Sequence, residues 1–285
     1  MKALKGVRVL SLSLNLPGPA ALMRCKAMGA TCVKLEPPSG DPMGVYNPNA
    51  YSQLNMGVRI AKADLKTELG QRVLHRELAK TDVLLTSFRP SALKKLGLVW
   101  KDLHKQYPQL SVVAIVGAPG ARAEEPGHDL TYMAENDLIP GLDLPASLYA
   151  DMGGSLMATE AVLQAVLMQR SKNEGVQIEV ALSEAASYIG LPRTWGLTKP
   201  GAAVGGGHAG YRVYPCKDGR VAVAALEPHF AASLCALAGV AVEGMKTLFM
   251  PQTHQTIEAW LATQTRKQLD DLAVQHDIPL HTLKK

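Results

Sequence analysis

The sequence predicts an α/β protein with a large Rossmann-like domain, built on a mostly parallel sheet, and a smaller α+β domain. Strand-like apolar segments alternate with helical patterns over residues 1–198, which is the order that produces a parallel sheet with helices on both faces. The pattern then changes to a hairpin followed by helices. With 285 residues, 47% of them hydrophobic, the chain can bury a sizeable core.

The chain begins with a β-α-β unit. Residues 7–13 alternate as a strand, and residues 20–28 follow the apolar spacing of a helix that Gly29 ends. Residues 31–36 form a second strand, which the prolines at 37–38 cannot continue. A unit of this kind is the repeating element of a parallel sheet.

Further strands and helices complete the large domain. A helical pattern over residues 67–80 precedes two buried strands, at 82–88 and 110–116. Residues 153–168 are small and apolar on nearly every face, which predicts a buried helix. Residues 176–182 alternate as the last strand of this domain.

A glycine-rich segment, residues 197–210, marks the domain boundary. It has few large side chains and is typical of a linker. We therefore place the large domain at residues 1–198 and the small domain at residues 199–285. The small domain is expected to contain strands at 211–214 and 220–225, joined by an Asp-Gly turn, and helices at about 230–238 and 254–274.

The composition argues against several classes of function. The net charge of +5 is spread along the chain and only 5% of the residues are aromatic, so a nucleic-acid partner is not expected. The four cysteines show neither a CxxC pair nor a histidine at zinc-finger spacing, so we expect no metal site. The apolar runs fall short of the ~20 residues that span a bilayer, and no signal-peptide pattern is visible. We therefore expect a cytoplasmic protein without a membrane partner.

Gly127, His128 and Asp129 follow a loop rich in glycine and proline after the strand at 110–116. This position lies beyond a carboxyl edge of the sheet, where open α/β sheets bind ligands. From position alone, a structural role for His128, as the cap of the next helix or as a solvated loop histidine, is as well supported as a functional one.

Two carboxylates lie near the ends of other elements. Asp151 precedes Gly153, Gly154 and the buried helix, a place where an aspartate commonly caps a helix or supports its dipole. Taken alone, Asp151 is better explained by that structural role. Glu227 follows a strand and precedes a proline, as a surface glutamate would.

Cations follow one of the buried strands. Arg89, Lys94 and Lys95 come directly after the strand at 82–88 and could present positive charge to phosphates. Taken alone this is a weak signal, because arginines are common in loops.

Several short motifs occur in a fixed order along the chain. They are Pro17-Gly-Pro19, Val33-Lys-Leu-Glu-Pro-Pro-Ser-Gly-Asp41, Ala63-Asp-Leu-Lys66, Phe88-Arg-Pro90, Leu96-Gly-Leu98, Gly127-His-Asp-Leu130, Asp151-Met-Gly-Gly154 and Ala225-Leu-Glu-Pro-His-Phe230. Together they resemble the class III CoA-transferase superfamily, also called the CaiB/BaiF family, and within it the motif set is most similar to that of α-methylacyl-CoA racemase. The resemblance runs from residue 6 to about residue 280.

The resemblance implies roles for three of the candidate residues. In the racemases, the residues at the positions of Asp151 and His128 form an acid/base pair on opposite sides of the substrate α-carbon. The glutamate at the position of Glu227 pairs with that histidine, from a neighbouring subunit. In the transferases, the aspartate at position 151 is instead a nucleophile that forms an acyl anhydride and then a CoA thioester. Because all three residues are present, the chain resembles the racemase branch more closely.

The resemblance also implies the substrate and the partner. An acyl-CoA thioester stabilises charge at its α-carbon, so two bases can invert that centre if donors, here the amides of Gly153 and Gly154, hold the enolate oxygen. No cofactor is expected beyond coenzyme A as part of the substrate, and a homodimer is expected. The candidate CoA contacts are Arg59, Arg89, Lys94, Lys95, Gly127, Asp129, Gly153 and Gly154.

The chain departs from the family pattern in places. Pro37 and Val58 stand where family members often carry a basic residue near the CoA phosphates. The sequence also stops about where the family's polypeptide returns to the large domain, which leads us to expect a shortened C-terminus. The alternatives are therefore a racemase, a family III CoA-transferase and a non-catalytic CoA-binding paralogue.

Overall fold

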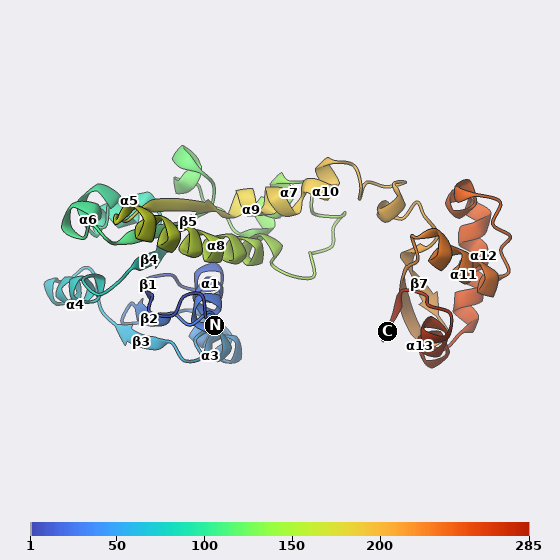
Figure 1. Ribbon diagram of the computed structural model, residues 1–285, viewed down its shortest axis with the longest axis horizontal. Coiled ribbons are helices and arrows are strands. Elements are labelled where there is room, and N and C mark those ends of the chain that lie inside the picture. The colour runs from blue at the N-terminus through green and yellow to red at the C-terminus, as the bar shows by residue number, and fades with distance from the viewer. Residues whose placement is uncertain (1, 285) are drawn as a thin grey trace. The chain divides into compact units, whose positions relative to one another are not determined.

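The computed structural model describes residues 2–284, which divide into two compact units, residues 2–190 and residues 191–284 (Figure 1). The division falls at Gly190, upstream of the boundary predicted between residues 198 and 199. Each unit has a sheet and a hydrophobic core of its own.

The first unit contains a six-stranded sheet in which every neighbouring pair of strands is parallel. The strand order is β3-β2-β1-β4-β5-β6, so the order reverses between β1 and β4. The predicted Rossmann-like sheet is confirmed, and ligands of such sheets bind beyond the carboxyl ends of the strands at this reversal. The strands are β1 (Arg8–Ser11), β2 (Thr31–Glu36), β3 (Arg59–Lys62), β4 (Val83–Thr86), β5 (Ser111–Val116) and β6 (Gln177–Ala181).

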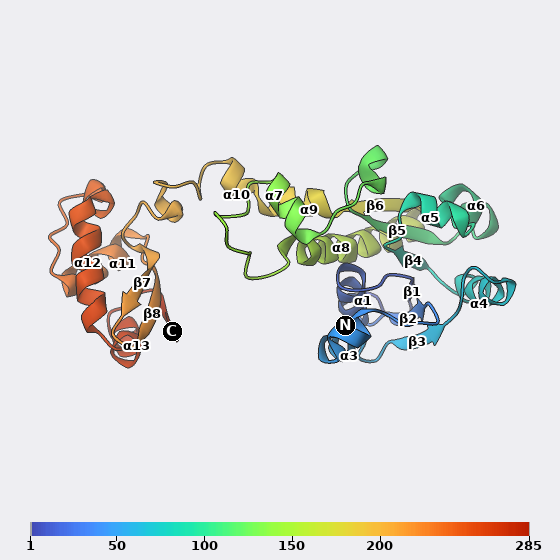
Figure 2. The same ribbon diagram turned by 180° about the vertical axis from the view of Figure 1, so that it is seen from behind.

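Helices cover both faces of this sheet, as Figures 1 and 2 show from opposite sides. Val9 and Leu10, adjacent on β1, point to opposite faces and belong to different cores. The Val9 face packs against α1 and α8, and the Leu10 face packs against α4 and α6. The helices of this unit are α1 (Pro17–Ala27), α2 (Met43–Tyr46), α3 (Pro48–Leu54), α4 (Glu68–Leu78), α5 (Pro90–Lys95), α6 (Trp100–Gln106), α7 (Asp129–Glu135), α8 (Tyr149–Lys172) and α9 (Leu182–Ile189), with a 3-10 helix at Gly120–Glu124.

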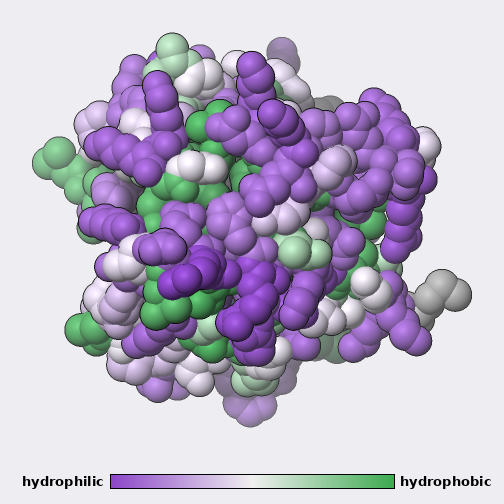
Figure 3. Space-filling model, turned by 90° about the vertical axis from the view of Figure 1, so that its left-hand side faces the viewer, coloured by the Kyte–Doolittle hydropathy of each residue, from purple (hydrophilic) through white to green (hydrophobic). Residues whose placement is uncertain are grey.

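The surface of the first unit on the α4 and α6 side is mostly polar. Figure 3 shows hydrophilic side chains over most of this face, with apolar side chains visible between them. None of the helices described for residues 2–284 combines the length and the apolar character that crossing a bilayer requires.

The second unit contains a three-stranded antiparallel sheet, in the order β7-β8-β9. The predicted hairpin is present, because β7 (Tyr211–Cys216) and β8 (Gly219–Ala224) are joined by a tight turn at Lys217 and Asp218. The third strand, β9 (Leu280–Leu283), was not expected from the sequence. The helices are α10 (Leu191–Thr194), α11 (Pro228–Ala238), α12 (Pro251–Thr263) and α13 (Arg266–Gln275), with 3-10 helices at Ala203–Gly205 and Met245–Phe249.

The prediction of a single helix over residues 254–274 is wrong. The segment forms two helices, α12 and α13, because Thr265 has an extended backbone and its hydroxyl accepts a hydrogen bond from the Gln268 N–H. A threonine that caps a helix in this way starts a new helix.

Candidate active site

The candidate site lies beyond the carboxyl end of β5, next to the reversal of strand order. The loop after β5 leads to His128 and α7, and the first turn of α8 carries Asp151. Helices α7 and α8 are in contact. The fold therefore brings together two of the three residues predicted to be catalytic.

His128 immediately precedes α7, and its side chain is exposed. Its backbone N–H donates to Thr131 Oγ1 at 3.0 Å, and the Thr131 hydroxyl donates back to the His128 carbonyl at 2.7 Å. These bonds fix the backbone at the start of α7. His128 thus occupies the cap position that its location suggested, and its charge acts on Asp151.

Asp151 is the third residue of α8 and is half-buried. Burial, reinforced by the negative charge of Asp129, raises the pKa of the Asp151 carboxyl from 3.8 to about 6, and His128 opposes this rise. His128 and Asp151 are therefore close enough to influence each other electrostatically. A carboxyl group with such a pKa exchanges protons near neutral pH.

Asp129 is the buried carboxylate of the site, with only 4% of its surface exposed. Its Oδ1 accepts a hydrogen bond of 2.9 Å from the Asp151 N–H, which joins the first turn of α7 to the first turn of α8. From the sequence Asp129 was expected to contact CoA, and that contact stays a prediction. Its link to Asp151 was not foreseen.

Two tyrosines near Asp151 were missed by the sequence analysis. Tyr132 on α7 is buried, and burial together with the Asp151 charge raises the pKa of its phenol. Its ring lies against Gly117 and Gly127, where a side chain on either glycine would collide with it. Gly127 is thus required for packing, and its predicted CoA contact is untested.

Tyr46, the last residue of α2, is 63% exposed. Desolvation and the charges of Asp41 and Asp151 raise the pKa of its phenol, which places it in the electrostatic neighbourhood of Asp151. Its hydroxyl lies 3.4 Å from Asn15 Oδ1. No periodicity or motif in the sequence singles out Tyr46.

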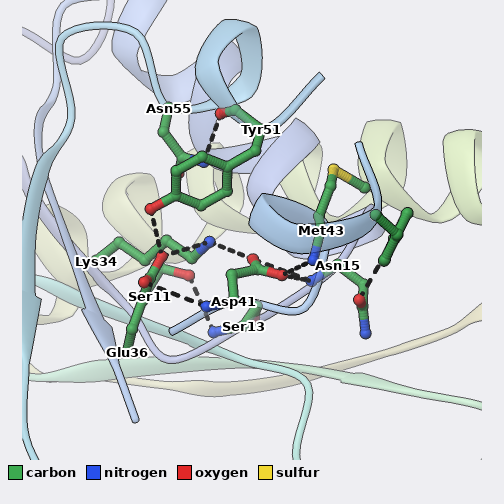
Figure 4. A network of polar contacts seen from close by, with 10 residues as sticks. Ser11, Ser13, Asn15, Lys34, Glu36, Asp41, Met43, Tyr51 and Asn55 are labelled. Atoms are coloured by element: carbon green, nitrogen blue, oxygen red, sulfur yellow. Dashed lines mark hydrogen bonds and ion pairs between the residues drawn. The ribbon is translucent and has the colours of Figure 1, made fainter. Parts of the chain in front are cut away.

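A buried polar network supports the segment that leads into α2, the helix that carries Tyr46 (Figure 4). Lys34 is fully buried and forms ion pairs with Asp41 and with Glu36, the latter at 3.2 Å. The Asp41 carboxylate accepts hydrogen bonds from the backbone N–H of Asn15 at 3.1 Å and of Met43 at 2.9 Å. The network therefore ties the turn after β1 to the start of α2.

Gly153 and Gly154 serve helix packing. They lie in α8 against α9, where an added Cβ would meet Ile189 from Gly153 and Leu182 from Gly154. Both residues lie beyond the first turn, where backbone N–H groups bond within the helix. The structure therefore does not favour the predicted role of these amides as donors to an enolate, and their contact with CoA is untested.

Arg89 is a candidate cation that shares a pocket with residues of the site. It lines a pocket of about 150 Å³ at the carboxyl ends of β4 and β5, together with Phe88, Gly127 and Tyr132. Its charge also acts on the Tyr132 phenol. Lys94 and Lys95 end α5, and Lys95 lines a separate groove of about 540 Å³ beside Lys66 and Thr67.

The structure does not bring Arg59 to this site. Arg59 begins β3, and its guanidinium forms an ion pair with Glu77 at 2.6 Å. Glu77 also forms an ion pair with Arg8 of β1, at 2.6 Å. Arg8 is the first residue of β1, so this cluster lies toward the amino ends of the strands. A phosphate contact by Arg59 would compete with its ion pair.

Glu227 lies in the second unit, where it is exposed and precedes α11. Its carbonyl accepts the Ala231 N–H at 2.9 Å. Its pairing with His128 stays a prediction. Among residues 2–284 no group of three His, Cys, Asp or Glu side chains is arranged to hold a metal ion.

Comparisons with known proteins bear on the family. The chain matches the model of CoA-transferase family III over residues 4–285. It is 30% identical to the α-methylacyl-CoA racemase of Homo sapiens over 246 residues, which cover 80% of this chain and 63% of the racemase. It is 28% identical to the cinnamoyl-CoA:phenyllactate CoA-transferase of Clostridium sporogenes over 204 residues, which cover 64% of this chain and 50% of the transferase.

Solved structures show the same fold. A CaiB/BaiF family protein from Brucella suis superposes with a TM-score of 0.84 at 23% identity, over 99% of this chain and 84% of that protein. A hypothetical protein from Mycobacterium tuberculosis superposes with a TM-score of 0.85 at 24% identity, over 100% of this chain and 86% of that protein. The chain spans less than two thirds of the curated racemases that it matches. As its ordered motifs predicted, the chain belongs to CoA-transferase family III.

Proposed function

We propose that the protein inverts the α-carbon of an acyl-CoA thioester by proton transfer between Asp151 and His128. One observation carries this proposal. A half-buried aspartate whose pKa is raised to about 6 lies within electrostatic range of an exposed histidine, beyond the carboxyl end of a central strand. Groups of this kind, held at a ligand-binding edge, suit general acid–base catalysis.

The proposed reaction needs one proton acceptor and one proton donor. The base takes the α-proton, and the electron pair of the C–H bond moves into the thioester enolate. The conjugate acid of the other residue then delivers a proton to the opposite face of the α-carbon. Asp151 and His128 exchange protonation states in each turnover, and solvent or the reverse reaction resets them.

Asp151 suits the donor role in one direction of this reaction. At pH 7 a carboxyl group with a pKa of about 6 is protonated in roughly a tenth of the molecules, whereas a solvated aspartate is protonated in fewer than about one in a thousand. Histidine accepts and releases protons in the same range of pH. We propose in addition that Glu227 supports His128 from a second copy of the chain.

A CoA-transferase is the second candidate function. The relatives include a cinnamoyl-CoA:phenyllactate CoA-transferase and a formyl-CoA:oxalate CoA-transferase. In such an enzyme ionised Asp151 would attack an acyl-CoA carbonyl, expel the CoA thiolate and hold the acyl group as a mixed anhydride. With a pKa of about 6, Asp151 is mostly ionised at neutral pH, as a nucleophile must be, so its pKa is compatible with this role as well.

Isotope exchange separates these candidates. The protein is incubated in heavy water with each enantiomer of a 2-methylacyl-CoA, and deuterium at the α-carbon is followed by mass spectrometry. We expect exchange with both enantiomers for wild-type protein and for Asp102→Asn, a control on the exposed surface of α6, and with only one enantiomer for Asp151→Asn. Absence of exchange, with an acyl group trapped on Asp151 by hydroxylamine, would favour the transferase. Binding of CoA without either reaction would favour a non-catalytic paralogue.

A further inference from the structure

A second carboxylate lies under Asp151. Asp129 is the first residue of α7 and is almost completely buried, at 4% exposed. Burying a carboxylate is costly unless donors compensate for the water it loses. The Asp151 N–H supplies such a donor at 2.9 Å, and the start of α7 favours a negative charge at this position.

This hydrogen bond gives the two carboxyl groups unequal surroundings. The Asp129 carboxylate accepts the Asp151 N–H and lies buried beside the first turn of α8. The Asp151 carboxyl is half-buried and feels the negative charge of Asp129. A neighbouring negative charge favours the protonated form of a carboxyl group.

The other groups that face Asp151 do not replace Asp129 in this role. His128, at the start of α7, acts in the opposite direction and favours the ionised carboxylate. Tyr132 on α7 and Tyr46 on α2 both have raised phenol pKa values, so they are uncharged at neutral pH. Asp129 is thus the neighbour whose charge favours a protonated Asp151.

We propose that Asp129 is a positioning residue of the site, which fixes the first turn of α8 through the Asp151 amide and places a negative charge beside the Asp151 carboxyl. The use of Asp151 as an acid or base rests on the proton transfer proposed above. The arrangement of Asp129 and Asp151 does not rest on that function, because it consists of residues of the first unit alone. Asp129 acts on the substrate only through Asp151.

The proposal is tested by titrating the side-chain carboxyl carbons of ¹³C-labelled aspartate by NMR, on the full chain without substrate. We expect the Asp151 midpoint near 6 in the wild-type protein and lower by about one pH unit in Asp129→Asn, which keeps an oxygen acceptor but removes the charge. Asp129→Glu is expected to restore most of the shift, and Asp102→Asn to leave the midpoint unchanged. An Asp129→Asn protein that titrates like wild type would overturn the proposal.

A measurement on the wild-type protein covers the case in which Asp129→Asn does not fold. The backbone amide of Asp151 donates to Asp129, so its proton and nitrogen shifts are expected to follow the ionisation of Asp129 as well as that of Asp151. An amide signal that follows Asp151 alone would contradict the arrangement. Because neither titration needs a substrate, a normal titration with no α-proton exchange would reject the proposed function and leave the role of Asp129 intact.

Discussion

The backbone N–H of Asp151 donates to Oδ1 of Asp129 at 2.9 Å. Residues 22 positions apart in sequence thereby join the first turns of two helices, α7 and α8, at the carboxyl edge of the sheet. His128 precedes one of these turns and Asp151 lies in the other. The geometry of the candidate acid/base pair therefore depends on how α7 is held against α8.

The effect of Asp151 on stability is expected to depend on pH. Its pKa is about 6 in the folded protein and 3.8 for a solvated aspartate, so the folded state binds this proton more tightly than the unfolded state. The resulting stabilisation is complete below pH 3.8 and is lost as the pH rises through about 6. Asp151→Asn should therefore gain free energy of unfolding relative to wild type as the pH rises, with a plateau above neutrality.

Urea unfolding at several pH values measures this difference, with Asp102→Asn as the control for loss of an exposed carboxylate. A stability difference between Asp151→Asn and wild type that is the same at acidic and at neutral pH would show that the pKa of Asp151 is not raised by folding.

Gly154→Ala is expected to destabilise the protein. In an exposed helix interior this change commonly adds up to about 1 kcal/mol of stability. Here the new methyl group would collide with Leu182 of α9, and overpacking of this kind costs roughly 1–3 kcal/mol. Gly44→Ala on α2 is the matched control, because its Cβ would lie 3.7 Å from the nearest neighbouring atom, a ring carbon of Tyr51. If thermal unfolding shows both variants equally stable, the α8–α9 packing is looser than described.

Lys34→Met is expected to cost about 3–5 kcal/mol in the free energy of unfolding. The change removes the cation from a buried cluster and leaves the carboxylates of Glu36 and Asp41 without their ion-pair partner. Lys105→Met, on the exposed surface of α6, should change stability by less than about 0.5 kcal/mol. Equal stability of the two variants in urea would mean that the network in Figure 4 does not support the loop.

Arg89→Ala is expected to weaken CoA binding by about tenfold or more, as loss of a hydrogen bond to a charged group does. Arg59→Ala should change the affinity by less than about twofold, because Arg59 is engaged with Glu77 away from the site. Isothermal titration calorimetry with CoA compares the two. A larger loss of affinity in Arg59→Ala than in Arg89→Ala would place the phosphates at the β3 side of the sheet.

The fold of the first unit could be predicted because its central strands are buried on both faces and read as apolar runs. Ser111–Val116 is buried at every residue, and in the sequence it stands out as an almost continuous run of apolar residues. β3 was missed, since Arg59–Lys62 is an edge strand with no fully buried residue and no apolar run. The division of 254–274 into two helices depends on one capping threonine, Thr265, inside a continuous helical pattern.

The candidate site could be predicted only in part. His128 and Asp151 belong to motifs with a recognisable order, so they were found. The role of Asp129 needs the contact between α7 and α8, which no local pattern encodes. Gly153 and Gly154 were expected to expose amides for a ligand, whereas the same absence of a side chain serves close packing against α9.

The central claim, two bases on opposite faces of the α-carbon, is tested most directly by face-specific exchange. Each enantiomer of a 2-methylacyl-CoA is incubated in heavy water with His128→Gln and with Asp151→Asn, and deuterium at the α-carbon is measured separately. We expect each variant to retain exchange with one enantiomer only, and the two variants to retain exchange with opposite enantiomers. The rate of interconversion of the enantiomers should fall by about a hundredfold or more in both variants. Exchange of the same enantiomer by both variants, or exchange unaffected by Asp151→Asn, would contradict it.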